Sequence, residues 1–139
     1  MINLLHITAH LGGGVGKVLA NLAAESRRRQ DGITHTVACL EKVEKTQFVE
    51  QVQAHGGEVL ISPSREVLEQ HISGADIVQL EWWHHPIVAG WMCSGNWPPM
   101  RLVVWSHVSG LHPPEIPPAF VGVPHRFLFT SPCSLDHPA

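Results

Sequence analysis

Short apolar runs alternate with segments of helical periodicity, and this alternation constrains the fold more than any other feature of the chain. The first run, Ile2–Thr8, is rich in branched side chains and ends at a glycine cluster, which is typical of a buried strand. Five further runs follow: Thr34–Leu40, Glu58–Ile61, Asp76–Leu80, Leu102–Ser106 and Arg126–Thr130. We predict a strand for each.

The segments between these runs carry helical signals. Apolar side chains from Val15 to Ala23 recur at helical spacing, three arginines at 27–29 suit the last turn, and Asp31-Gly32 ends the segment. A second helix is predicted around 48–52. A third begins after Ser64 as N-cap and ends at Gly74 as C-cap. A short helix is expected over Ile87–Cys93.

Strands separated by helices of this length form right-handed βαβ units with parallel strands. The near-continuous apolar runs suit a sheet that is covered on both faces. We therefore predict an α/β fold, a Rossmann-like doubly wound parallel sheet of about six strands. The expected strand order is 3-2-1-4-5-6, in a single domain over residues 1–139.

Composition excludes several classes of protein. The 139 residues are 44% hydrophobic and only 15% charged, which argues against disorder. A net charge of −3 argues against a nucleic-acid partner. No run is long enough for a membrane span, and the N-terminus does not resemble a signal peptide. The three cysteines form no CxxC pair, so we expect a cytoplasmic location with at most peripheral contact at the inner membrane surface.

The charge is unevenly distributed along the chain. All five tryptophans and ten of the eleven prolines lie after residue 81, where few residues carry formal charge. A small domain with such an apolar end usually covers it against another domain, a second subunit or a lipid-like ligand. Self-association through this part of the chain is therefore one expectation.

The least ordinary residues follow the predicted strands. Open α/β sheets bind ligands beyond the carboxyl ends of their strands, where the strand order reverses. The turn after the first strand is glycine-rich, with Gly12, Gly13, Gly14 and Gly16. The turn after the fourth is Glu81-Trp82-Trp83-His84-His85-Pro86, and His107 follows the fifth. We expect all three turns at one edge of the sheet.

The glycine turn has several interpretations. Glycines let the backbone approach a ligand, and the following helix N-terminus favours an anion. A P-loop would need a hydroxyl after Gly16-Lys17, but that residue is Val18, which cannot bind Mg²⁺. The dinucleotide fingerprint GxGxxG does not fit the glycine spacing. A tight turn without any ligand remains an alternative.

Four segments together resemble the amino-terminal domain of GT-B glycosyltransferases, particularly the retaining family 4 (group 1) enzymes. These segments are NLLHITAHLGGGVGKVLANLA, DIVQLEWWHHP, VVWSHVSG and RFLFTSPCS. Each motif alone is weak, but their order and spacing cover nearly the whole chain. The resemblance implies half of a two-domain enzyme, because the donor domain with its E-x7-E motif is missing.

What the resemblance implies is an acceptor-side domain that moves a sugar from a nucleotide-sugar to a hydroxyl-bearing acceptor. The nucleotide-sugar donor would bind only in the full enzyme. This domain alone would bind no cofactor and lack activity. A P-loop-like ATPase with a degenerate GGVGK loop, and a non-catalytic Rossmann-like binding module, are the alternatives.

The resemblance also assigns roles to single residues. His107 would be catalytic and touch the donor sugar, and the glycines at 12, 13, 14 and 16 would form the donor-phosphate loop. Glu81, Trp82, His84 and His85 would bind the acceptor, together with Trp83. The alternatives are a His107 satisfied by neighbouring backbone, a solvated Glu81 and a Trp83 packed in the core.

A metal site is not expected. His84, His85, His107 and His112 show no helical ligand spacing and no evident carboxylate partner. Cys93 and Cys133 have no evident base partner, so a thiol nucleophile is not indicated.

Overall fold

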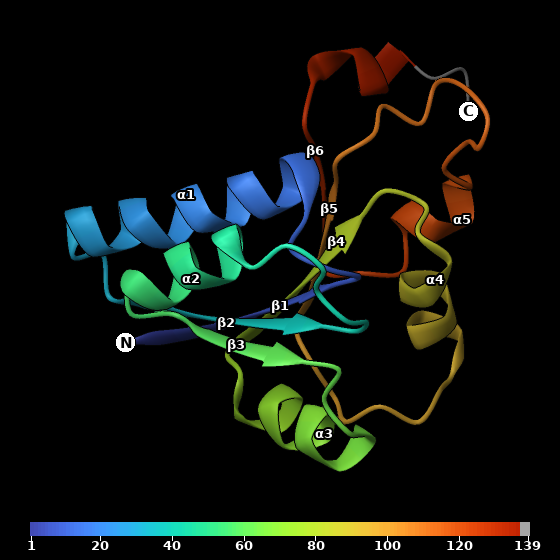
Figure 1. The fold of residues 1–139 in the computed structure, drawn as a ribbon. Coiled ribbons are helices and arrows are strands. Elements are labelled where there is room, and N and C mark those ends of the chain that lie inside the picture. Colours follow the sequence, from blue (N-terminus) through green and yellow to red (C-terminus); the bar gives the residue numbers. More distant parts are fainter. Residues whose placement is uncertain (137–139) are drawn as a thin grey trace.

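A six-stranded parallel sheet forms the centre of the computed structural model, which describes residues 1–136 (Figure 1). Its strands are β1 (Ile2–Thr8), β2 (Ile33–Cys39), β3 (Glu58–Ile61), β4 (Ile77–Trp82), β5 (Leu102–Ser106) and β6 (Arg126–Phe129). The strand order is β3-β2-β1-β4-β5-β6, and every neighbouring pair is parallel. The predicted Rossmann-like fold and strand order are therefore confirmed.

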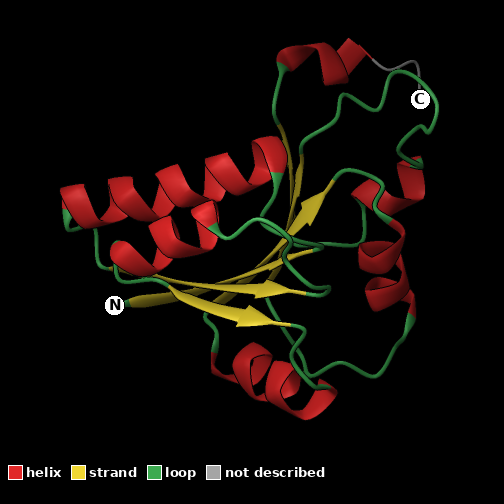
Figure 2. Cartoon of the chain, in the orientation of Figure 1, coloured by secondary structure: helices red, strands yellow, loops and turns green. Residues whose placement is uncertain are grey.

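Helices cover both faces of the sheet, as in a doubly wound fold (Figures 1 and 2). On one face lie α1 (Gly13–Arg29) and α2 (Gln47–Ala54), which pack with β2 around Val37 and Val52. On the other lie α3 (Arg65–Gly74), α4 (Pro86–Cys93) and the short α5 (Pro118–Val121). A 3-10 turn, η1 (Pro132–Asp136), closes the described chain.

Alternation along the central strands divides their side chains between the two faces. On β1, Leu5 and Ile7 point toward α3 and α4, where they join a large apolar core with Leu80 and Val104. The same strand turns His6 toward α1. The α1 face is therefore polar over β1 and β4 and at His35 on β2, and apolar at Val37 and Cys39 farther along β2.

Local signals explain where the helices begin and end. The Ser64 side chain accepts a hydrogen bond from the Val67 N–H and caps α3. His85 caps α4 in the same way, by accepting the Ile87 N–H at 3.2 Å. Gly74, predicted as the C-cap of α3, is instead its last helical residue, and Ala75 takes the cap position. The strand β4 begins two residues after this cap, at Ile77.

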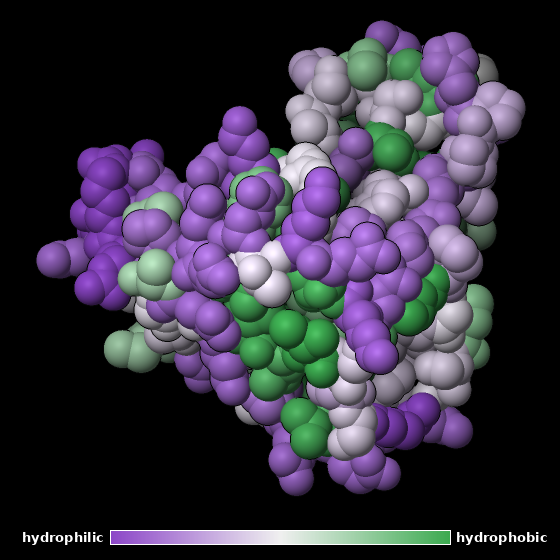
Figure 3. Space-filling view, in the orientation of Figure 1, coloured by the Kyte–Doolittle hydropathy of each residue, from purple (hydrophilic) through white to green (hydrophobic). Residues whose placement is uncertain are grey.

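The outer end of α1 is the most polar part of the surface shown in Figure 3. Arg28 and Arg29 both bind the Glu25 carboxylate there, and these charges hold the pKa of Glu25 down at about 2.

Among the described residues, no helix is both long enough and apolar enough to span a bilayer.

Candidate functional site

The turns after β1, β4 and β5 meet at the carboxyl edge of the sheet. They line an open hollow of about 450 Å³, which we call the glycine-loop hollow. Its lining residues are His10, Gly12, Gly13, Gly14, Val15, Val18, Trp83, His107 and Thr130. A neighbouring hollow of about 660 Å³ shares His10, Gly12 and Gly13 and extends along the loop at 41–45.

The glycines of the loop have different physical roles. Gly13 has φ +59°, a left-handed conformation that favours glycine, and it opens α1 at the rim of the hollow. A β-carbon at Gly14 would meet no atom within 4 Å. Gly16 is different, because it is buried and a β-carbon there would collide with the Leu11 backbone and the Phe48 ring. Gly13 and Gly14 are therefore exposed at the start of α1, Gly12 before them is half-buried beside the His10 ring, and Gly16 lets α1 pack closely.

His107 is held by a buried carboxylate. Its Nε2 lies 2.6 Å from Glu81 Oε2, and its backbone N–H donates to the Trp82 carbonyl at 2.8 Å. The His107 side chain is 9% exposed and Glu81 is fully buried. His107 is thus satisfied by a carboxylate on the adjacent strand, a partner that sequence reasoning did not identify.

Glu81 receives three hydrogen bonds. Besides His107, His6 Nδ1 donates at 2.9 Å and the Gln79 amide at 2.7 Å. Burial alone would raise the pKa of the Glu81 carboxyl, but these donors outweigh it and hold the pKa below its ordinary value. The buried group is therefore a carboxylate at neutral pH.

Further side chains extend this contact across the sheet. His6 Nε2 lies 3.0 Å from His35 Nδ1 on β2, and His35 Nε2 lies 2.8 Å from Ser26 Oγ on α1. The two rings lie edge to edge, with centroids 5.3 Å apart and planes inclined by 13°. We call Ser26, His35, His6, Glu81 and His107 the buried polar line. Burial, together with the neighbouring His6, lowers the pKa of His35 to about 4, so His35 is neutral at pH 7.

The adjacent tryptophans separate as alternation requires. Trp82 is 8% exposed and packs in the core beside Phe120, with ring centroids 4.7 Å apart. Trp83 points the other way and lines the glycine-loop hollow, next to the His10 ring. Of the pair, Trp82 is the core residue and Trp83 the one that a ligand can reach.

The next two residues, His84 and His85, also have different surroundings. His84 adopts φ 64° and packs its ring against Trp82, and burial lowers its pKa. His85 caps α4 and places Nε2 3.3 Å from Glu41 Oε1. Within the described residues neither lines the glycine-loop hollow.

His10, Glu41 and His85 place one potential metal-ligating atom each within 4.8 Å of one another. Their hydrogen bonds disfavour a metal. His10 Nδ1 accepts the Gly12 N–H at 2.9 Å, and His85 Nδ1 accepts the Ile87 N–H. A neutral ring whose Nδ1 accepts carries its proton on Nε2, so no lone pair remains for a metal. Ligation would require both rings to give up these bonds.

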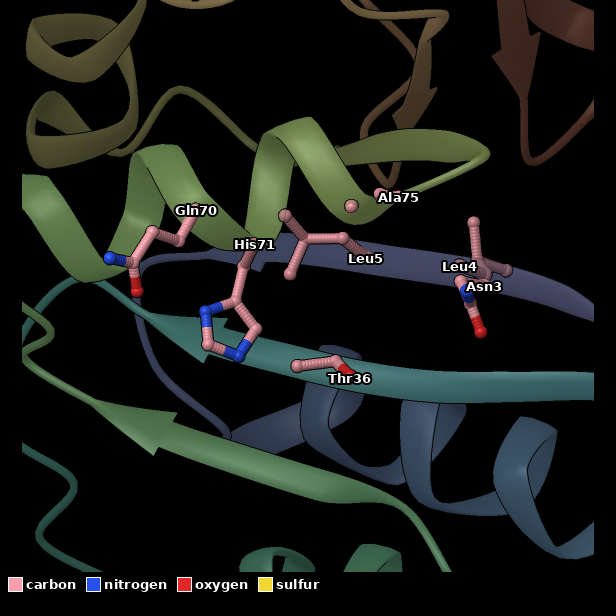
Figure 4. Close-up of a pocket in the computed structure, with 8 residues that line it drawn as sticks. Asn3, Leu4, Leu5, Thr36, Gln70, His71 and Ala75 are labelled. Carbon is pink, nitrogen blue, oxygen red and sulfur yellow. The ribbon is translucent and has the colours of Figure 1, made fainter.

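Another hollow, of about 240 Å³, lies on the opposite face of the sheet, between α3 and the first halves of β1 and β2 (Figure 4). Figure 4 shows His71 and Thr36 beside this gap. His71 Nδ1 donates to the Val67 carbonyl at 2.8 Å, and its Nε2 lies 3.6 Å from Glu58. None of the residues predicted from the sequence to form a site lines it.

The structure therefore brings His107 and Trp83 together with Gly12, Gly13 and Gly14 of the glycine turn. Glu81 reaches this hollow only through His107. Trp82, His84, His85 and Gly16 lie outside its lining. His6, His35 and Ser26 were not singled out from the sequence, although His6, His35 and Gln79 interrupt apolar strands at alternating positions.

Fold and site together define a Rossmann-like α/β domain with a histidine–carboxylate pair opposite a glycine loop. No protein-family model, curated protein or solved structure matches the chain.

Proposed function

We propose that this chain is the acceptor-side half of a retaining glycosyltransferase, which moves a sugar from a nucleotide-sugar to a hydroxyl-bearing acceptor. The sequence resemblance to GT-B enzymes supports this proposal, and so does the Rossmann-like sheet that such a half requires. The single observation that carries it is the placement of His107, paired with Glu81, in one hollow with Gly13 and Gly14.

Each part of the hollow has a role in such a reaction. The backbone N–H groups of Gly13 and Gly14, at the N-terminus of α1, would stabilise charge that develops on the leaving diphosphate. His107 would contact a sugar hydroxyl. The Trp83 indole offers a flat apolar face, as sugar rings prefer.

The second domain would grip the nucleotide-sugar. Because oriented donor and acceptor supply most of the rate, this chain alone would bind ligands weakly and transfer sugar negligibly. An ATPase of the P-loop type fits less well, since Val18 lines the hollow where a Mg²⁺-binding hydroxyl would be required.

Ligand binding tests the proposal directly. The chain, labelled with ¹⁵N, is titrated with UDP-glucose, with methyl α-D-glucopyranoside and with Mg-ATP, and the amide and ring signals are followed. We expect millimolar binding of methyl α-D-glucopyranoside, with shifts confined to the residues that line the hollow, and no detectable binding of UDP-glucose, which would need the second domain. His107→Gln should weaken this binding, whereas His55→Gln, at an exposed position away from the hollow, should not.

Two results would contradict the proposal. One is folded protein whose signals do not move with either sugar probe. The other is Mg-ATP binding at least tenfold tighter than methyl α-D-glucopyranoside, which would favour the ATPase.

A further inference from the structure

The buried polar line has a direction, and that direction follows from which atoms can donate. A carboxylate only accepts, so His107 Nε2–H and His6 Nδ1–H both donate to Glu81. A neutral imidazole carries one N–H, and a neutral His6 uses its own toward Glu81. His6 Nε2 must therefore accept, and the donor is His35 Nδ1–H at 3.0 Å.

The same reasoning continues to the end of the line. His35 has used its single N–H toward His6, so its Nε2 accepts from the Ser26 hydroxyl at 2.8 Å. His35 is neutral at pH 7, as this arrangement requires. Every hydrogen in the line thus points toward Glu81. A second proton on His6 would reverse the line, because His35 would then have to accept at Nδ1 and donate from Nε2 to Ser26.

His107 is the exception in this network. Its Nδ1 has no hydrogen-bond partner among the described residues and is not sealed in the interior, while the ring lines the glycine-loop hollow. A proton can therefore be added at Nδ1 without reversing any other bond. We infer that Ser26, His35 and His6 are positioning residues that orient the Glu81 carboxylate. This carboxylate holds the His107 Nε2–H in a hydrogen bond. The Nδ1 of His107 is then the atom that exchanges a proton or a hydrogen bond with a ligand hydroxyl.

The ligand part of this inference rests on the proposed function, but the hydrogen-bond pattern does not. In a sugar-transfer site, Nδ1 would accept a hydrogen bond from a sugar hydroxyl and fix its direction. The line would keep the ring from rotating or changing tautomer when the ligand leaves. The role of Ser26, His35 and His6 is thus indirect, since none of the three lines the hollow.

Histidine tautomers can be measured by two-bond ¹⁵N–¹H correlation in the whole chain, with signals assigned by single His→Gln variants. We expect His6 and His35 as neutral Nδ1–H forms. His107 should carry a proton on Nε2, alone or together with one on Nδ1. A His107 protonated only on Nδ1, or a His35 protonated on Nε2, would overturn the inference.

Glu81→Gln tests whether the line acts as a unit. A glutamine amide has one accepting oxygen and one NH₂ group, so at least one flanking ring must turn a lone pair toward it. If His6 is that ring, His35 must reverse with it. If it is His107, Nδ1 gains the proton and the ligand loses its acceptor. Glu58→Gln, an exposed control, should leave all three tautomers unchanged.

If folded Glu81→Gln keeps all three tautomers unchanged, the residues of the buried polar line do not act as a unit. If this variant does not fold, the tautomers of the unaltered chain still decide the matter. Binding of methyl α-D-glucopyranoside separates the two proposals. We expect Glu81→Gln to weaken it about tenfold, the effect of one well-placed hydrogen bond. The expected tautomers without any sugar binding would refute the proposed function alone.

Discussion

The glycine loop yields the sharpest prediction, because two of its glycines face opposite environments. At Gly16, a β-carbon would lie 2.6 Å from the Leu11 carbonyl carbon, still closer to its oxygen, and 2.8 Å from the Phe48 ring. The backbone atoms cannot move aside as a flexible side chain would. Gly16→Ala must therefore shift the start of α1 away from the sheet edge.

The size of the effect follows from two opposing contributions. Overpacking of this kind costs about 1–3 kcal/mol, while alanine gains about 1 kcal/mol of helix propensity over glycine. We expect Gly16→Ala to lower the free energy of unfolding by up to about 2 kcal/mol. Gly14→Ala meets open space at a residue without positive φ, so it should be neutral or stabilising by up to about 1 kcal/mol.

Urea unfolding, followed by far-UV circular dichroism and tryptophan fluorescence, measures both variants against the unaltered chain. The slope with urea should stay the same, so that the midpoints report stability. Equal stability of the two variants, or a Gly14→Ala less stable than Gly16→Ala, would refute the packing argument. Gly14→Ala also serves the binding test, because its methyl group projects at the hollow of a folded protein.

Three further predictions follow from burial and pKa. His35 stays neutral in the folded protein down to a pH of about 4, whereas the same side chain takes up a proton near pH 6.5 in the unfolded chain. The free energy of unfolding should therefore fall by about 3 kcal/mol as the pH drops through this window. His35→Gln should flatten that slope in urea unfolding at several pH values, and a slope that survives would contradict the assignment; His55→Gln is the control. Burial raises the pKa of the Cys39 thiol to about 12. Ellman's reagent should therefore react at once with the two exposed thiols, Cys93 and Cys133, and with Cys39 only after unfolding. Three rapidly reacting thiols in the native protein would contradict the burial of Cys39. Trp82→Ala should lower the free energy of unfolding, measured in urea, by about 3–5 kcal/mol, because Trp82 packs in the core. Trp83→Ala should lower it clearly less, because Trp83 lines the hollow. The reverse order would mean that the two side chains lie on the opposite faces of the sheet from those described.

Periodicity was sufficient to predict the architecture. The six strands and their order followed from apolar runs, turn residues and the handedness of βαβ units. The short helix α5 and the turn η1 were not predicted, because elements of four or five residues carry too few apolar positions to show a period. Most boundaries shifted by about one residue, as at Gly74, where the helix continues to the glycine itself. The strand β4 extends two residues past its predicted end, so Glu81 and Trp82 belong to the strand and not to the turn after it.

The site was only partly accessible to sequence reasoning. His107 and the glycine loop were predicted from their places after strands, and the structure does bring them to one hollow. The partners of His107 were missed, because a carboxylate on one strand and imidazoles on two others have no fixed spacing along the chain. A signal was nevertheless present: His6, His35 and Glu81 each stand at a position where an otherwise apolar strand would place an aliphatic side chain.

The buried polar line also has a consequence for strand alignment. Aliphatic runs alone tolerate several registers, since one branched side chain packs much like another. A one-residue slip of β4 against β1 would carry the Glu81 carboxylate to the aliphatic side of the sheet, where no donor awaits it. Leaving a carboxylate stranded in hydrocarbon is far more costly than any mismatch among methyl groups. The buried polar line thus selects one register for the pairing of the central strands.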